Sequence, residues 1–351
     1  MTAGTAFPAS YKRAWENIHL CSWARLMSYP NAARSAALNR AGLAIWSVVF
    51  VPGLLCAQQA VSAGMASFPA DTQQVDYSNF AQLRSSPDYP QIRQYVLYRQ
   101  FHGFQEFLRS LGIDPEKDVD EVLLGWRGES LGGPGSYGVA AGRFEPDKVR
   151  ALVMQNRLPV QSHVGYDLFA YGSGADPADI FFTILDSSLA AFGRLHDLKA
   201  LLDVKEGSAD PLESNQAFRG YEAELEQTSA QWGVLTGKAA ANVAAPWLAG
   251  GKKTTIDVTV FTDSIQAVLY RVDWDGTFTV HISVVCKTPE TAAGLFKLLN
   301  ILKSLPVSSD AGGRPASASL LQNLDARQDG SRLELSASGP AEALDQILRV
   351  E

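Results

Sequence analysis

Apolar side chains recur at helical and strand spacings through the chain after residue 63. Spacings of three and four residues between Leu97 and Leu111 predict an amphipathic helix over 91–111, which ends at Gly112. Alternating or continuous short apolar runs predict strands, and turn-forming residues between two such runs predict hairpins. The elements predicted after this helix are strands at 118–127, 137–144, 168–171 and 180–185, and helices at 146–156 and 194–202.

The second stretch of the chain repeats this order. An Asp-Gly turn joins two strands, and a proline then opens a helix, because proline is favoured at a first helical position. The predicted elements are a helix at 236–249, strands at 263–272 and 277–286, a helix at 289–303, two short strands around Asp329-Gly330 and a helix at 340–349.

Three landmarks in the two stretches share one offset. A strand start, a helix start and a turn each recur 143 residues later, at Asp120 and Asp263, Pro146 and Pro289, and Asp186 and Asp329. A constant offset is typical of a duplicated unit. We therefore predict an α+β protein of two tandem repeats, 64–210 and 211–351. Each is expected to be a mainly antiparallel sheet with helices packed on one face.

An uncharged apolar run at 43–57 precedes these elements. Arg34 and Arg40 lie before it and small residues follow, which is the order of a secretory signal. The run is shorter than the roughly 20 residues that cross a bilayer as a helix. We expect 1–63 to be a leader and cleavable signal peptide, cut after Ala57 or Ala63, which leaves no transmembrane anchor. The mature protein would be extracytoplasmic, either periplasmic or secreted.

Two features of the leader leave alternatives open. Lipidation of Cys56 would require a small residue before it, but Leu55 stands there. The length of 1–40 is unusual for a signal peptide, and translation from Met27 would remove most of it.

The charge of the chain disfavours one class of partner. The whole chain carries a formal charge of −7, and the first 63 residues hold five bases and one acid, so the remainder has 25 bases against 36 acids, a net of −11. An acidic body without a basic stripe lacks the electrostatic footprint needed to bind phosphates. We therefore expect no nucleic-acid partner and no attraction to an anionic membrane.

Two glycine-rich motifs lie side by side in the loop after residue 127. Residues 128–132 match G-x-S-x-G, with Ser130 in the position of a nucleophile, and 133–138 match G-x-G-x-x-G. Both chemistries need a helix directly after the motif, and here a strand follows. We interpret the segment as a flexible hairpin loop. A serine hydrolase using Ser130 and a distant base (His163, His196 or His281) is the alternative.

No ligand set for a metal or cofactor is evident. The histidines stand singly, and we interpret His196-Asp197 as a helix cap or surface contact. Asp273 and Asp275 flank an Asp-Gly turn, which explains them without calcium. Cys286 is the single cysteine after residue 63 and lies in a strand, so it is expected to be a small buried hydrophobe. The sequence thus assigns no catalytic, cofactor-binding or metal-binding residue.

Aromatic residues line one side of the predicted helix over 91–111. Such a series is typical of core beneath a sheet, or it could line a groove for an apolar ligand. Its members are Tyr95, Tyr98, Phe101, Phe104 and Phe107.

Four segments resemble exported bacterial proteins of unknown function. They are Phe-Pro-Ala-Asp-Thr-Gln at 68–73, Asn-Phe-Ala-Gln-Leu-Arg at 79–84, Leu-Gly-Ile-Asp-Pro-Glu-Lys-Asp-Val-Asp at 111–120 and Ala-Gly-Arg-Phe at 141–144. The resemblance covers mainly the first repeat. It implies an extracytoplasmic setting and no enzyme, and it transfers no functional residue.

The leading hypothesis is a non-catalytic extracytoplasmic protein that binds a partner protein or an apolar ligand between two related lobes. The alternatives are the serine hydrolase using Ser130 and a structural envelope component, which would have no closed pocket.

Overall fold

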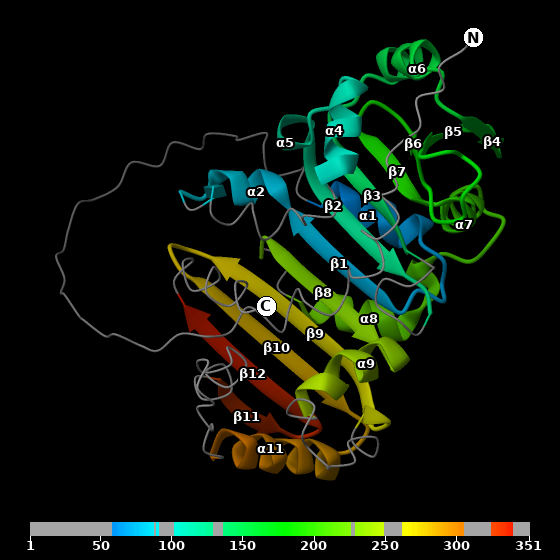
Figure 1. The fold of residues 1–351 in the computed structure, drawn as a ribbon. Coiled ribbons are helices and arrows are strands. Elements are labelled where there is room, and N and C mark those ends of the chain that lie inside the picture. Colours follow the sequence, from blue (N-terminus) through cyan, green and yellow to red (C-terminus); the bar gives the residue numbers. More distant parts are fainter. Residues whose placement is uncertain are drawn as a thin grey trace, which may run out of the picture.

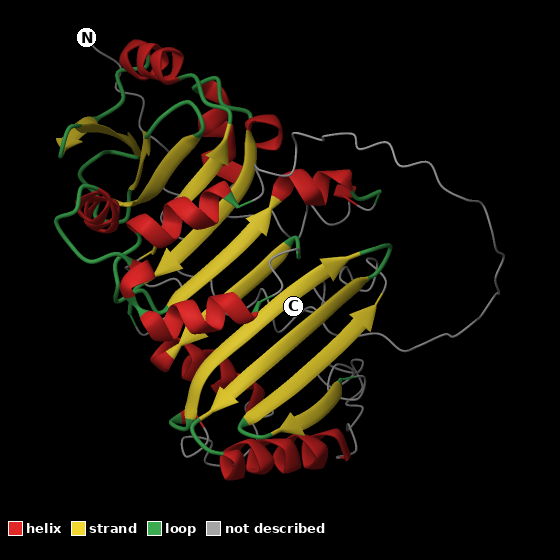
Figure 2. Ribbon diagram, turned by 180° about the vertical axis from the view of Figure 1, so that it is seen from behind, coloured by secondary structure: helices red, strands yellow, loops and turns green. Residues whose placement is uncertain are grey.

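The fold is built on one antiparallel sheet of twelve strands. The computed structural model describes residues 58–87, 89–90, 102–128, 136–225, 229–248, 262–304 and 324–339. Its strand order is β11-β12-β10-β9-β8-β1-β2-β3-β7-β6-β5-β4, and helices cover both faces (Figures 1 and 2). The predicted α+β class and antiparallel pairing are confirmed.

The first half of the chain supplies one side of this sheet. Its elements are α1 (Gln59–Ser67), β1 (Gln74–Asn79), α2 (Phe80–Ser85), α4 (His102–Ser110), α5 (Pro115–Asp118), β2 (Val119–Trp126), β3 (Ser136–Gly142), α6 (Pro146–Gln155), β4 (Val160–His163), β5 (Tyr166–Tyr171), β6 (Ile180–Ile184), β7 (Leu189–Arg194) and α7 (Leu195–Lys205).

The second half supplies the other side. Its elements are η3 (Leu212–Ser214), α8 (Gln216–Glu224), β8 (Gln231–Thr236), α9 (Gly237–Leu248), β9 (Ile265–Trp274), β10 (Phe278–Cys286), α11 (Pro289–Ser304), β11 (Asp325–Asp329) and β12 (Arg332–Gly339). The helix predicted at 340–349 lies outside the described residues.

Side-chain alternation along the strands gives the sheet two apolar faces. In β3, Val139 and Ala141 join the core beneath α1, α7 and α8, and we call this side the α1 face. Ala140 points the other way, into the core beneath α4 and α6, and we call this side the α6 face. The sequence predicts helices on one face of each sheet. The helices observed lie on both, because β3 buries apolar side chains on each side.

The β1–β8 pair joins the two halves. Outward from it, β2, β3, β7 and β6 follow on one side, and β9, β10, β12 and β11 follow on the other. Each side contains a hairpin, a helix opened by Pro146 or Pro289, and a second hairpin that returns beside the first. Over five strands on each side, the strand order therefore reads the same from the centre in both directions, and the first half adds β5 and β4 beyond β6. The two predicted sheets form a single continuous one.

Candidate ligand cavity

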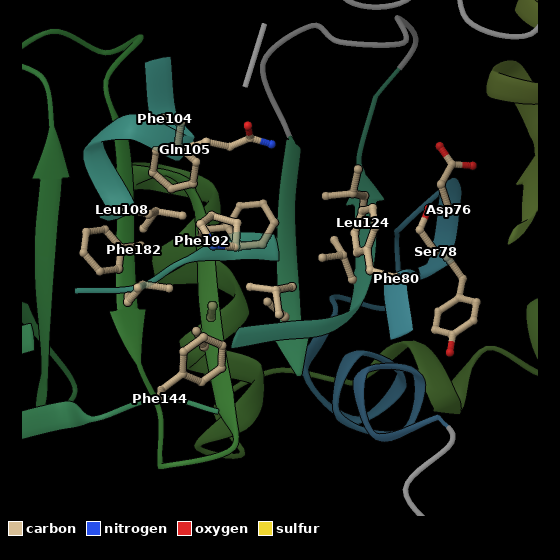
Figure 3. Close-up of a pocket in the computed structure, with 18 of the residues that line it drawn as sticks. Asp76, Ser78, Phe80, Phe104, Gln105, Leu108, Leu124, Phe144, Phe182 and Phe192 are labelled. Carbon is tan, nitrogen blue, oxygen red and sulfur yellow. The ribbon is translucent and has the colours of Figure 1, made fainter. Parts of the chain in front are cut away.

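A cavity of about 140 Å³ lies on the α6 face of the first half, between the sheet and α4 (Figure 3). Its floor is formed by two rows of residues that the strand register places side by side across β1, β2, β3 and β7. The rows are Asp76, Leu124, Gly138 and Phe192, and Ser78, Val122, Ala140 and Ala190.

Small residues at the centre of the floor leave the space open. Ala140 lies directly opposite Ala190. Because each side chain is a single methyl group, neither rises far above the sheet. A Cβ atom on Gly138 would come within 2.5 Å of Phe192 Cζ and 2.9 Å of Leu124 Cδ2. The glycine therefore lets the Phe192 ring lie across β3, where the ring forms part of the cavity wall.

Aromatic and aliphatic side chains from α4 form the opposite wall. The ring centroid of Phe104 is 6.4 Å from those of both Phe182 and Phe192. Leu108 extends the same wall one turn further along the helix. Gly112 has φ +75° and the Ile113 N–H donates to the Leu108 carbonyl, so the chain turns sharply after α4. This turn brings Ile113 back to the cavity.

Two polar side chains interrupt the apolar lining. Gln105 on α4 is 5% exposed, and its side chain forms no hydrogen bond in the described part of the chain. In Figure 3 its amide extends from α4 toward the side where Asp76 and Ser78 lie. Asp76 on β1 is partly buried and accepts hydrogen bonds from the Tyr270 hydroxyl and from Gln74 Nε2, the latter at 2.7 Å.

The environment of Asp76 changes its ionisation. Removal of water by burial raises the pKa of this carboxyl to about 6, and the hydrogen bonds from Tyr270 and Gln74 oppose the rise. Tyr270 can approach because its β8 neighbour is Gly233, where a Cβ would lie 2.4 Å from the tyrosine ring. The carboxylate is therefore mainly ionised at neutral pH and neutral in moderate acid.

The cavity matches a small apolar molecule in size and lining. An apolar protein cavity of about 150 Å³ stays dry and binds benzene. The described lining is mainly apolar and contains one carboxylate, that of Asp76.

A second, more polar hollow of about 700 Å³ lies beside the start of α7. The Asp197 carboxylate is buried there and pairs with Arg127 Nη2 at 3.1 Å, while the Arg127 guanidinium lies 5.8 Å from the Tyr137 ring centre. His196 is exposed. The interpretation of His196-Asp197 as a surface contact is thus corrected for Asp197. Its partner is 70 positions away, and local sequence gives no signal for that contact.

Several sequence candidates fall outside this geometry. Ser130, Gly133 and Gly135 lie outside the described residues, as do Tyr95, Tyr98 and Phe101. Of the aromatic series, Phe104 lines the cavity, whereas Phe107 packs on Tyr171 with ring centroids 4.8 Å apart. The groove interpretation therefore applies to Phe104, and the core interpretation applies to Phe107.

The remaining polar candidates have structural partners. His163 Nε2 lies 2.7 Å from Asp203 Oδ1, which ties β4 to α7. Asp275 and Gly276, with φ +64° at the glycine, form the β9–β10 turn as predicted. Cys286 is buried, and burial raises the pKa of its thiol to about 11. Within the described ranges, no three His, Cys, Asp or Glu side chains are grouped so that they could hold a metal ion.

Comparisons with known proteins give a distant structural likeness. No protein-family model matches the chain, and no curated protein matches significantly. Crystal forms I and IV of TP0453 align with TM-scores of 0.45, and form III aligns with 0.43. Each has 10% identity over 82% of this chain and 95–96% of the other. At these values the likeness carries no inference about function. None of the helices described is long and apolar enough to cross a membrane.

Proposed function

We propose that this chain is a non-catalytic extracytoplasmic protein that binds a small apolar molecule in the cavity between α4 and the sheet. The observation that carries the proposal is the phenylalanine-lined space above Ala140 and Ala190. Native interiors are packed to crystal-like density, so a space of this size is costly unless something fills it. The proposed location rests on the signal-like run at 43–57.

The proposed site differs in position from a cleft between two lobes. Most of its described lining comes from the first half, and Gln231 and Tyr270 are the described residues of the second half that reach it. We therefore assign binding to a cavity on one half of the sheet, at the edge of the junction between the halves.

The lining also restricts the class of ligand. Phe104, Phe182 and Phe192 favour a hydrocarbon ring or a short chain. The free amide of Gln105 can bond one neutral polar group on it. An ionised Asp76 repels a carboxylate in a space of low polarity, so the ligand is expected to be uncharged at neutral pH.

Three ring compounds of similar size test this assignment. Toluene and benzyl alcohol should raise the Tm of the mature protein at pH 8, because a ligand that binds only the folded state stabilises it. Benzoate should leave the Tm unchanged at that pH. Absence of any Tm shift or NMR chemical-shift change with toluene and benzyl alcohol would contradict the proposal.

Adjacent alanines on opposite faces provide a matched pair of variants. Ala140→Leu should fill the cavity, abolish the toluene response and change stability by less than about 1.5 kcal/mol, because the new methyl groups enter empty space. Ala141→Leu should cost about 1–3 kcal/mol by overpacking the α1 face. Below its own Tm, Ala141→Leu should still bind toluene. Equal toluene responses in the two variants would count against this site.

We also propose that the two halves, 64–210 and 211–351, arose by tandem duplication. The constant offset of 143 residues and the strand order that reads alike in both directions from β1–β8 support it. Residues 119–194 should superpose on 265–339 by a rotation about an axis at the β1–β8 pair, which least-squares superposition measures. A poor superposition would contradict the proposed duplication.

A further inference from the structure

The packing of α1 discriminates between the two candidate cleavage sites of the leader. Val61 and Ala63 fit both positions that a signal peptidase recognises, whereas Leu55 fits less well before Ala57. Cleavage after Ala63 would, however, remove five residues of α1. Two of them, Ala60 and Val61, are 0% and 5% exposed in the core of the α1 face. Their loss would leave a hole over the sheet.

A buried carboxylate depends on the same residues. Glu121 on β2 is 4% exposed. Its Oε1 accepts the backbone N–H of Gln58 at 2.8 Å, and its Oε2 accepts that of Ala60 at 3.0 Å. In the described part of the chain no Lys or Arg pairs with it. A charge buried without a counter-charge is costly, and removing 58–63 would also take away both of its donors.

The backbone of Gln58 gives an independent indication. Its φ is +98°, in the left-handed region that a residue with a side chain rarely adopts. The torsion φ is defined by the carbonyl carbon of the preceding residue, and the strain comes from that carbonyl group. An N-terminal residue has no preceding carbonyl, so cutting the bond before Gln58 removes the strain.

We propose that the mature protein begins at Gln58 and that its α-ammonium group forms an ion pair with the buried Glu121 carboxylate. Water hydrolyses the Ala57–Gln58 peptide bond: its oxygen enters the Ala57 carboxylate, and the Gln58 nitrogen leaves as an ammonium. That nitrogen already lies within hydrogen-bond distance of Oε1, so no rearrangement is needed. The inference rests on the export part of the proposed function and is independent of the cavity.

The other groups around this pair do not replace it. Tyr77 on β1 faces Glu121, and burial together with the negative charge of Glu121 raises the pKa of its phenol, so it remains neutral. Gln59, next to the new terminus, bonds Ser188, whose hydroxyl donates to Asp186. The α-ammonium is thus the positive charge that α1 can offer Glu121.

Intact-mass measurement of the protein from extracytoplasmic fractions tests the site. The expected mass is that of 58–351 with a free amine. A chain starting at Gly64, a lipidated chain starting at Cys56, or cyclised Gln58 that has lost ammonia would overturn the inference while export stands. An uncut chain in the cytosol would overturn export as well, and a negative toluene experiment alone would leave this inference intact.

Thermal unfolding of Glu121→Gln tests the ion pair. The variant should lower the Tm of the mature protein by about 5 °C or more. It should have a clearly smaller effect in a chain that keeps Ala57, where the nitrogen is an uncharged amide. Pairing raises the α-amino pKa in the folded state, so the difference between wild type and variant should be full below pH 8 and shrink above it.

Glu106→Gln is the control, since its side chain is 73% exposed and bonds Arg109 at the surface. It should leave the Tm nearly unchanged in both chains. Equal losses for Glu121→Gln in the two chains, or a loss independent of pH, would show that Glu121 acts only as a hydrogen-bond acceptor for α1.

Discussion

The two halves share a strand order but fill the α6 face differently. In the second half, the face carries branched aliphatic residues on adjacent strands: Ile282, Val284, Leu333 and Leu335. In the first half, Gly138 and Ala140 stand on β3 and Ala190 on β7, with phenylalanine rings around them. The same sheet layout thus supports an aliphatic core in one half and a ligand-sized space in the other.

This difference distinguishes residues that stabilise the fold from residues that line the proposed ligand cavity. Leu295 on α11 is buried against β10 and β12, where its loss cannot be compensated. Leu108 on α4 is half-buried and borders existing space. Stability should therefore depend more on the covering helix of the second half.

Truncation of these two leucines should have the largest effect. Leu295→Ala should cost about 2–5 kcal/mol, because it opens a new hole in a packed core. Leu108→Ala should cost about 1–2 kcal/mol and let the cavity accept larger rings than benzyl alcohol. Urea unfolding and the Tm shifts with toluene and a bicyclic hydrocarbon measure both. Equal costs for the two truncations would remove the distinction between the halves.

Asp76→Asn should have the next largest effect, and it depends on pH. The native pKa of about 6 lies above the ordinary carboxyl value of 3.8, so the native state holds its proton more tightly than the unfolded chain. Ionised Asp76 therefore costs stability above pH 6, by up to about 3 kcal/mol. The cost disappears as the pH falls below 4. Asp76→Asn should be more stable than wild type at pH 8 and similar at pH 4.

The control for this prediction is Asp275→Asn. Its Asp-Gly turn becomes Asn-Gly, which suits the same hairpin, and the side chain is exposed. In urea unfolding, the stability difference between Asp275→Asn and wild type should stay the same between pH 4 and pH 8, whereas that of Asp76→Asn should change. An Asp76→Asn protein destabilised at pH 8 would mean that the bonds to Tyr270 and Gln74 outweigh burial.

Local patterns were sufficient for elements with clear periodicity. The helix predicted at 289–303 is α11 at Pro289–Ser304, and the strand predicted at 277–286 is β10 at Phe278–Cys286. The central pair β1 and β8 was not predicted. Asp76 and Gly233 interrupt their apolar alternation, and they pair across more than 150 positions of the chain. Such non-local pairing leaves no mark within one short segment.

The cavity was predictable only in part. The aromatic series on 91–111 pointed to Phe104, which does line the space. Nothing in the sequence places Ala140 opposite Ala190, because that depends on the β3–β7 register across an intervening helix and three strands. The buried state of Gln105 is equally hidden, since a glutamine on a helix is usually exposed.

Gln105→Leu should have the smallest effect and the most specific one. Gln105 is 5% exposed and its amide forms no hydrogen bond in the described part of the chain, so an apolar side chain of similar size should stabilise the empty protein by up to about 1 kcal/mol. The same change should weaken benzyl alcohol binding relative to toluene, because the hydroxyl loses its partner while the ring keeps Phe104 and Phe192. Titration calorimetry with both compounds gives the ratio of affinities. If that ratio is the same in wild type and Gln105→Leu, then the amide does not select the ligand, and the cavity discriminates by shape and by the charge of Asp76 alone.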